Sequence, residues 1–282
     1  MRIIQDLRKS VPARQSAEDS TLWYGEALER RRGGFAQVLI DPDWPRPPGV
    51  HAIQTTRQGG VSLAPYTALN LAAHVGDTPT YVQENRRLLR EHLALPSEPL
   101  WLEQVHGIEV HQARHAESLS QPPRADAAYT DQPGIVLSVL TADCLPVLFA
   151  SQDGEEIAAA HAGWRGLLNG VLEATLGAFK SPPGQITAWF GPAISQAAFE
   201  VGIDVRDAFI HDAPEAHRAF IPANRPRHWQ ADLYALARLR LHALGVMQIF
   251  GGKLCSYSDP ENFYSYRRAT PTGRMASLIW RS

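Results

Sequence analysis

The sequence IVLSVLTADCLPVLFA, residues 135–150, decides the fold, because it places two apolar runs on either side of a short polar turn. The first run is Ile135–Leu140 and the second is Val147–Ala150, and neither shows strict alternation of apolar and polar residues. Strands of this kind are covered on both faces, so they belong inside a layered structure. Asp143 and Cys144 stand between the runs. The stretch therefore predicts buried strands with a carboxylate and a thiol where the first strand ends.

Further strands and helices alternate along the chain around this stretch. We expect strands at Ile157–Ala160, Ile186–Phe190, Met247–Phe250 and Ala276–Trp280. Apolar residues at helical spacing predict helices at Pro79–Leu93, Leu168–Phe179 and Leu233–Leu244, the last followed by Gly245 as its C′ residue. Several strands follow one another too closely for helical crossovers, which excludes a purely parallel sheet. The pattern predicts an α/β fold, α+β by some schemes, with a single layered α-β-α domain and a mixed β-sheet.

The first 36 residues differ from the rest of the chain in composition. They are polar and Arg-rich, with one predicted helix from Ser20 to Arg32 that begins at a capping Ser and ends before Gly33-Gly34. We expect residues 1–36 to be a loosely attached extension and residues 37–282 to form the catalytic domain. No apolar segment of the signal-peptide type occurs in the first thirty residues, so no secretory signal is predicted.

The bulk composition favours a small-molecule partner. The net charge of −2 and the pI near 6.6 provide no basic surface for a phosphate backbone, which argues against nucleic acid. No apolar run reaches the length of a membrane span, which argues against a membrane partner. With only two cysteines in 282 residues, a reducing cytoplasm is the expected location. The oligomeric state stays open between monomer and homodimer.

Three segments each place a metal-binding or nucleophilic side chain where a strand is expected to end. They carry His106, Cys144 and His161. Three protein ligands with a fourth position for water or substrate are typical of a catalytic zinc site, and a His₂Cys set suits zinc. Asp143 is a candidate partner or proton carrier beside Cys144, because a carboxylate at the end of an apolar strand is costly unless it orients or charges something.

These residues also allow less specific interpretations. A Cys in apolar surroundings is more often an inert core residue, and a His before Gly107 suits a turn equally well. The spacings of 38 and 17 residues match no compact zinc-finger pattern. His74 is a weaker ligand candidate, while His111 and His115 are expected to be solvated.

An anion site is predicted beside His161. Gly163-Trp164-Arg165-Gly166 opens a helix after a strand, so free N–H groups and the positive end of the helix dipole point into the turn. Arg165 could add a bidentate phosphate donor, although a capping turn with a solvated Arg is the alternative. Arg57, Arg267 and Arg268 are further candidates that could converge on an anionic substrate.

Read in order, these segments closely resemble the YfiH family, known variously as laccase-domain proteins, polyphenol oxidases, peptidoglycan editing factors and purine nucleoside phosphorylases. The resemblance runs from about Trp44 to Trp280. Its motifs include Thr55-Thr56-Arg57, Asn70-Leu71, Gln104-Val105-His106-Gly107, Arg124-Ala125-Asp126-Ala127, Ala142-Asp143-Cys144-Leu145-Pro146, His161-Ala162-Gly163-Trp164-Arg165-Gly166 and Phe263-Tyr264-Ser265-Tyr266-Arg267-Arg268 with Gly273-Arg274.

The resemblance implies one α/β domain with zinc bound by His106, Cys144 and His161. It implies phosphorolysis of adenosine, inosine and guanosine, cleavage of methylthioadenosine, and adenosine deamination. Purine nucleosides and inorganic phosphate are then the expected partners. His106, Cys144, His161 and Asp143 are the expected catalytic residues, and the expected substrate- or phosphate-binding residues are Arg57, Asn70, Arg165, Arg267 and Arg268.

Three other functions stay open on the sequence. Cys144 could be the nucleophile of an amidase that edits peptidoglycan precursors, with His106 or His161 as base. A copper-dependent polyphenol oxidase fits less well, because a blue-copper site wants a weak axial ligand and multicopper sites need many paired histidines. A non-enzymatic binding module would require the His₂Cys set to be a closed structural site.

Overall fold

Two large sheets hold most of the strands in the computed structural model, which describes residues 28–32, 35–114 and 121–282. The five-stranded sheet is antiparallel and has the order β1 (Leu28–Arg32), β2 (Phe35–Ile40), β3 (Val50–Thr55), β14 (Met275–Arg281) and β6 (Val136–Thr141). The six-stranded sheet is mixed and has the order β13 (Gln248–Gly251), β9 (Ile186–Phe190), β7 (Leu145–Ser151), β8 (Ile157–Ala162), β5 (Ala127–Thr130) and β4 (Val110–Gln112). The α/β class predicted from the sequence is confirmed, with two main sheets where one was expected.

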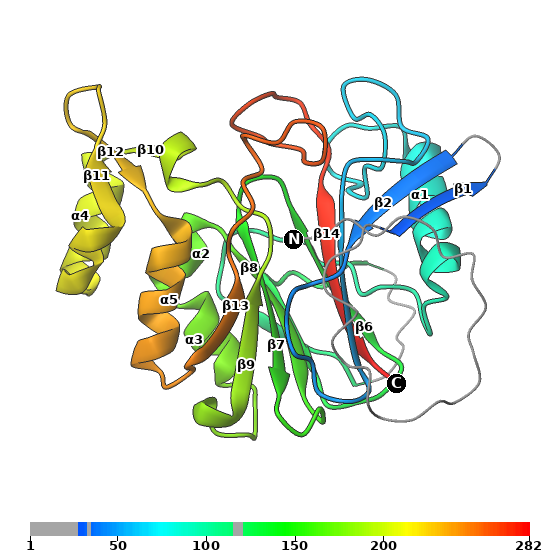
Figure 1. Cartoon of the computed structure of the whole chain (residues 1–282), viewed down its shortest axis with the longest axis horizontal. Coiled ribbons are helices and arrows are strands. Elements are labelled where there is room, and N and C mark those ends of the chain that lie inside the picture. The colour runs from blue at the N-terminus through cyan, green and yellow to red at the C-terminus, as the bar shows by residue number, and fades with distance from the viewer. Residues whose placement is uncertain (1–27, 33–34, 115–120) are drawn as a thin grey trace.

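The two sheets pack face to face, and helices cover their outer faces (Figure 1). In β7, Leu145, Val147 and Phe149 face a core shared with helices, whereas Leu148 and Ala150 face the core between the sheets. Both faces of this strand are therefore buried, which explains why its sequence is apolar without alternation. The predicted α-β-α layering becomes an α-β-β-α arrangement.

The helices partly follow their predicted bounds. They are α1 (Pro79–Leu93) on the five-stranded sheet and, around the six-stranded sheet, α2 (Trp164–Asn169), α3 (Val171–Leu176), α4 (Ile203–Asp212) and α5 (Leu233–Ala243) (Figure 1). The predictions for α1 and α5 are confirmed, and Gly245 has the positive φ of a C′ residue. The single helix expected at Leu168–Phe179 is wrong. Gly170 at φ 101° separates α2 from α3 because an α-helix cannot continue through that conformation.

Residues 28–32 form an edge strand, not a helix. They pair with β2, so the helix predicted from Ser20 to Arg32 is wrong for its last five residues, and the rest of it lies outside the described residues. The expected boundary between an extension at residues 1–36 and a domain at residues 37–282 stays a prediction.

Long loops gather at one end of the two sheets. The segments of residues 56–78 and 252–274 lie there together (Figure 1). The Arg57 N–H donates to the carbonyl of Asn262, and the Tyr264 hydroxyl donates to the carbonyl of Tyr66. A small antiparallel sheet of β10 (Glu200–Gly202), β12 (His228–Ala231) and β11 (Phe220–Pro222) lies beside α4. In the described part of the chain no helix is both long and apolar enough to cross a bilayer.

Candidate functional site

His106, Cys144 and His161 come together where three chain segments meet. Cys144 lies in the turn between β6 and β7, His161 lies near the end of β8, and His106 lies in the loop that precedes β4. One ligand atom from each lies within 4.8 Å of the other two. Cys144 Sγ is 3.6 Å from His106 Nε2, and the two imidazole rings have centroids 4.8 Å apart at 75°. The structure therefore unites the three residues that the sequence singled out.

Asp126 positions both histidines of this group. Its fully buried carboxylate lies 2.8 Å from His161 Nδ1, and it accepts hydrogen bonds from the backbone N–H groups of Val105, His106 and Gly107 at 2.7–3.0 Å. Because His161 Nδ1 bonds to Asp126, His161 Nε2 is the nitrogen available to a metal or to a proton. The three backbone bonds fix the loop that carries His106, which has a positive φ of 61°.

Sequence reasoning missed Asp126 as a site residue. The signal was available, because Asp126 directly precedes the small apolar strand β5, and a carboxylate in such a place is costly unless it is satisfied.

The charges of Cys144, His161 and Asp126 support one another. Burial raises the pKa of the Cys144 thiol, but His161 and His106 outweigh burial and hold that pKa below its usual range. Burial lowers the pKa of His161, but the Cys144 thiolate and Asp126 outweigh it and raise that pKa. Burial likewise raises the pKa of Asp126, and His161 together with the backbone donors brings it below its usual range. Without metal, a thiolate–imidazolium–carboxylate chain is the favoured state.

This donor set fits a zinc ion. Zn–S and Zn–N bonds of about 2.3 and 2.0–2.1 Å at a tetrahedral angle place S and N roughly 3.5 Å apart, close to the 3.6 Å between Cys144 and His106. His161 is buried, Cys144 is half-buried and His106 is exposed, so the group is open on one side. An open site with three protein ligands is the catalytic rather than the structural pattern.

Gly163 makes room for the group. A Cβ at this position would lie 2.7 Å from His106 Cδ2 and 3.0 Å from Cys144 Sγ. The residue has φ −66°, which any residue adopts, so space rather than backbone conformation requires glycine.

We expect Gly163→Ala to weaken zinc retention by about tenfold or more, the cost of disturbing a ligand's support, while the melting temperature changes little. Gly177→Ala is the matched control, because its Cβ would only reach backbone carbonyls at an ordinary 3.4 Å. Both are measured by competition with a zinc chelator and by thermal melting. Equal zinc affinity in the two variants would contradict the packing argument.

Asp143 ties the turn of Cys144 to two later loops. Ser256 Oγ donates to its Oδ1 at 2.6 Å, and the Arg267 N–H donates to its Oδ2 at 2.7 Å. The residue has a positive φ of 97°, an uncommon conformation that these bonds stabilise. A direct catalytic role for Asp143 stays a prediction.

Three of the predicted arginines donate to backbone carbonyls of neighbouring loops. The acceptors are Thr67 and Pro260 for Arg57, Glu200 for Arg267, and Ser256, Tyr257 and Phe263 for Arg268. These bonds stabilise the loops around the site, and those of Arg57 and Arg268 use several donors that a phosphate would need, whereas Arg267 uses only its Nη1. Their role in phosphate binding stays a prediction.

Arg165 and Asn70 have different surroundings. Arg165 is exposed in the first turn of α2, and its guanidinium lies 4.3 Å from the centroid of the Trp164 ring. Asn70 is fully buried, and its amide bonds to the Asp77 carboxylate and to the backbone N–H of Arg274. Asn70 therefore shapes the loop next to the site, and direct substrate contact by either residue stays a prediction.

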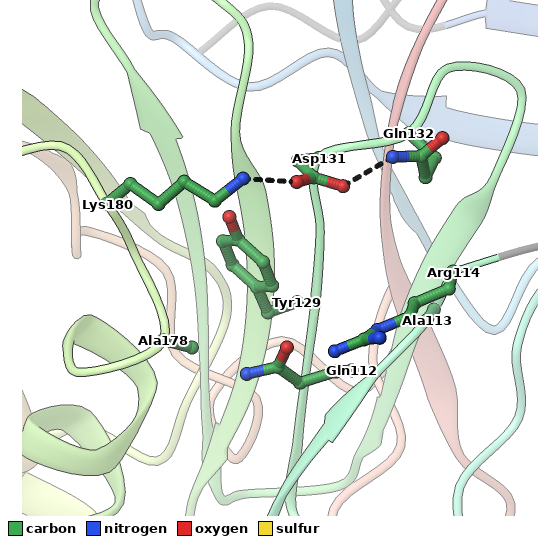
Figure 2. A pocket seen from close by; sticks show the side chains of 8 residues that line it. All are labelled: Gln112, Ala113, Arg114, Tyr129, Asp131, Gln132, Ala178 and Lys180. Carbon is green, nitrogen blue, oxygen red and sulfur yellow. Dashed lines mark hydrogen bonds and ion pairs between the residues drawn. The ribbon is translucent and has the colours of Figure 1, made fainter.

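A separate cavity of about 380 Å³ lies at β4 and β5 (Figure 2). Its charged side chains include Arg114, Asp131 and Lys180, and the Lys180 ammonium pairs with Asp131 at 2.7 Å. None of His106, Cys144 and His161 lines it. The group of potential ligands therefore lies outside this cavity.

Comparison with known proteins relates most of this chain to other chains. The family described as multi-copper polyphenol oxidoreductase laccase matches residues 51–282. An Escherichia coli K12 protein named purine nucleoside phosphorylase YfiH is 54% identical over 242 residues, which cover 86% of this chain and 98% of that protein. A Pseudomonas aeruginosa protein, also named as a purine nucleoside phosphorylase, is 52% identical over 86% of this chain and 97% of its own.

A solved structure shows the same fold. The crystal structure of a Neisseria meningitidis protein of the DUF152 family is 48% identical and has a TM-score of 0.82, covering 86% of this chain and 99% of that one.

Proposed function

Since the chain belongs to the multi-copper polyphenol oxidoreductase laccase family, we propose that it is a purine nucleoside phosphorylase, the activity for which its similar relatives are named. The proposed zinc ligands are His106, Cys144 and His161. The observation that carries the proposal is the open three-ligand group, buttressed by Asp126. Adenosine, inosine, guanosine and methylthioadenosine are the proposed substrates, together with inorganic phosphate. Adenosine deamination at the same site, a cytoplasmic location and the catalytic domain at residues 37–282 belong to the same proposal.

Phosphorolysis exchanges one bond at the ribose anomeric carbon. An oxygen of phosphate bonds to C1′, the bond from C1′ to the base nitrogen breaks, and its electron pair leaves with the base, which takes up a proton. The protein must therefore bind an anion next to C1′, hold the nucleoside in line, and stabilise the leaving base.

The residues around the group have different roles in this reaction. His106, Cys144 and His161 would hold the metal, which when bound supplies a Lewis acid that polarises a substrate oxygen or nitrogen. Asp126 keeps His161 in one tautomer and fixes the backbone of residues 105–107. Because His106 is exposed, a substrate can approach the group from that side.

The test is release of free base from inosine and adenosine by the zinc-loaded protein, followed chromatographically with and without inorganic phosphate. Phosphate-dependent hypoxanthine and adenine, with ribose 1-phosphate as the co-product, are the expected result. Inosine accumulating from adenosine would show the deaminase activity in the same experiment. If neither nucleoside released base, the phosphorylase proposal would be wrong.

A cysteine hydrolase is the second candidate, and one observation favours it. Cys144, His161 and Asp126 form a chain in which a thiol neighbours an imidazole whose other nitrogen bonds to a carboxylate. This is the order of nucleophile, base and orienting group. An amidase of this type would act on aminoacyl cell-wall precursors, keep its activity in a strong chelator and lose it on alkylation of Cys144.

A multicopper oxidase finds less support. Such a centre needs several groups of histidine ligands, whereas the described part of the chain contains one group of potential metal ligands. Copper therefore stays the less favoured metal.

A further inference from the structure

Arg274 lies close to the group formed by His106, Cys144 and His161. It directly precedes β14, and Met275, the first residue of β14, pairs with Thr141 of β6. The antiparallel register thus places Arg274 level with the Ala142–Cys144 turn. Cys144 and Asp143 both act to raise the pKa of Arg274, against the larger opposing effect of burial. The side chain is therefore within electrostatic reach of Cys144, one of the proposed metal ligands.

The guanidinium of Arg274 has no carboxylate partner among the described residues. Only its Nη1 has hydrogen-bond acceptors there, the carbonyls of Thr272 at 2.9 Å and Gly273 at 3.0 Å. Its backbone N–H is held by the buried Asn70 Oδ1 at 3.0 Å. Burial lowers the pKa of Arg274, which reflects a partly desolvated cation. The side chain is held in place, and its Nε and Nη2 have no hydrogen-bond acceptor among the described residues. Such a cation is suited to bind an oxyanion.

Two further basic groups lie beside Arg274. Arg86 donates through Nε and Nη2 to the carbonyl of Leu71 at 3.0 and 2.8 Å, and its guanidinium lies 4.1 Å from the centroid of the Trp101 ring. The Leu71 N–H in turn donates to the carbonyl of Arg274. His74 follows on the same loop, and burial, Arg274, Arg86 and His161 all lower its pKa. The two guanidinium charges thus lie together on one side of the group, while these effects favour the neutral form of His74.

We propose that Arg274, with Arg86 and His74 behind it, forms the oxyanion subsite of this centre and binds inorganic phosphate. Arg274 differs from Arg57, Arg267 and Arg268, because it combines proximity to Cys144 with unused donors on Nε and Nη2. Its two carbonyl contacts orient the fork before the anion arrives, which reduces the entropic cost of binding. The catalytic use of this phosphate rests on the proposed phosphorylase function, whereas phosphate binding itself does not.

Calorimetric titration of the zinc-loaded protein with inorganic phosphate tests the subsite directly. Losing a hydrogen bond to a charged group costs about 1.5–3 kcal/mol, so Arg274→Gln should weaken phosphate binding about 10- to 100-fold. Arg274→Lys keeps the charge but not the fork, and we expect it to recover part of the loss. Arg90→Gln is the control. Arg90 is an exposed residue of α1 that pairs with Glu98, and this variant should bind phosphate as the wild type does.

Steady-state kinetics separate the subsite from the proposed function. In Arg274→Gln, KM for phosphate should rise about 10- to 100-fold while KM for inosine changes little. Zinc content and melting temperature are checked for each variant. If phosphorolysis proceeds but Arg274→Gln and Arg274→Lys leave both phosphate affinity and KM unchanged, the subsite is wrong and the function stands. If phosphate binds through Arg274 yet no nucleoside is cleaved, the subsite stands and the proposed function fails.

Discussion

Cys144→Ser is expected to lose its bound zinc and its phosphorylase activity together. A hydroxyl is a far poorer zinc ligand than a thiolate, and the lowered pKa of Cys144 shows that the site already favours the thiolate. Loss of a residue that only orients a ligand costs about 10- to 100-fold in metal affinity or activity. Because Cys144 is itself a proposed ligand, we expect zinc affinity and the rate of phosphorolysis to fall by more than this. Metal analysis after dialysis and base release from inosine measure both effects on one sample.

Cys255→Ser is the matched control for that variant. Cys255 is also a half-buried free thiol, but its sulfur accepts hydrogen bonds from the backbone N–H groups of Ser195 and Ser258 and does not belong to the three-ligand group. It should retain zinc and activity. Full zinc content in Cys144→Ser would contradict the assignment of Cys144 as a ligand.

Asp126→Asn is expected to weaken zinc binding about 10- to 100-fold, because Asp126 orients His161 and the loop of His106. The amide would leave an NH₂ group facing backbone N–H donors, since the carboxylate now accepts three of them. Burial of that mismatch should also cost on the order of 3 kcal/mol of folding free energy. Removing the carboxylate should lower the pKa of His161, because Asp126 helps to raise it.

Asp131→Asn is the matched control. Asp131 directly follows β5, whereas Asp126 directly precedes it, and Asp131 pairs with the exposed Lys180. It should leave zinc affinity and the His161 titration unchanged. Chelator competition, thermal melting and NMR titration of His161 in the metal-free protein are the measurements. Wild-type zinc affinity in Asp126→Asn would show that the carboxylate has no part in holding the ligands.

The sequence predicted those parts of the fold that local patterns encode. The apolar runs of β6, β7 and β8 identify strands covered on both faces. The spacing of apolar residues in α1 and α5 identifies two helices and places their ends within one residue of those in the structure. The division of the strands into two sheets could not be read, because register and pairing between β3, β14 and β6 join segments that are far apart in sequence. The break at Gly170 depends on a single positive φ inside an otherwise helical pattern.

The site was predictable to a similar degree. His106, Cys144 and His161 stand out because each follows an expected strand or precedes a glycine turn, and the structure brings them together. The surroundings of the arginines were not predictable. Arg57 is bound by the distant carbonyl of Pro260, whereas Arg274 lies near Cys144 only through the pairing of β14 with β6.

The most direct test of the account is a zinc titration of metal-stripped protein, with phosphate-dependent release of hypoxanthine from inosine as the readout. We expect no activity in the stripped protein, a linear rise as zinc is added, and a plateau at one equivalent for the His106, Cys144 and His161 site. Undiminished activity in the stripped protein with a strong chelator would contradict it and would favour Cys144 as a nucleophile.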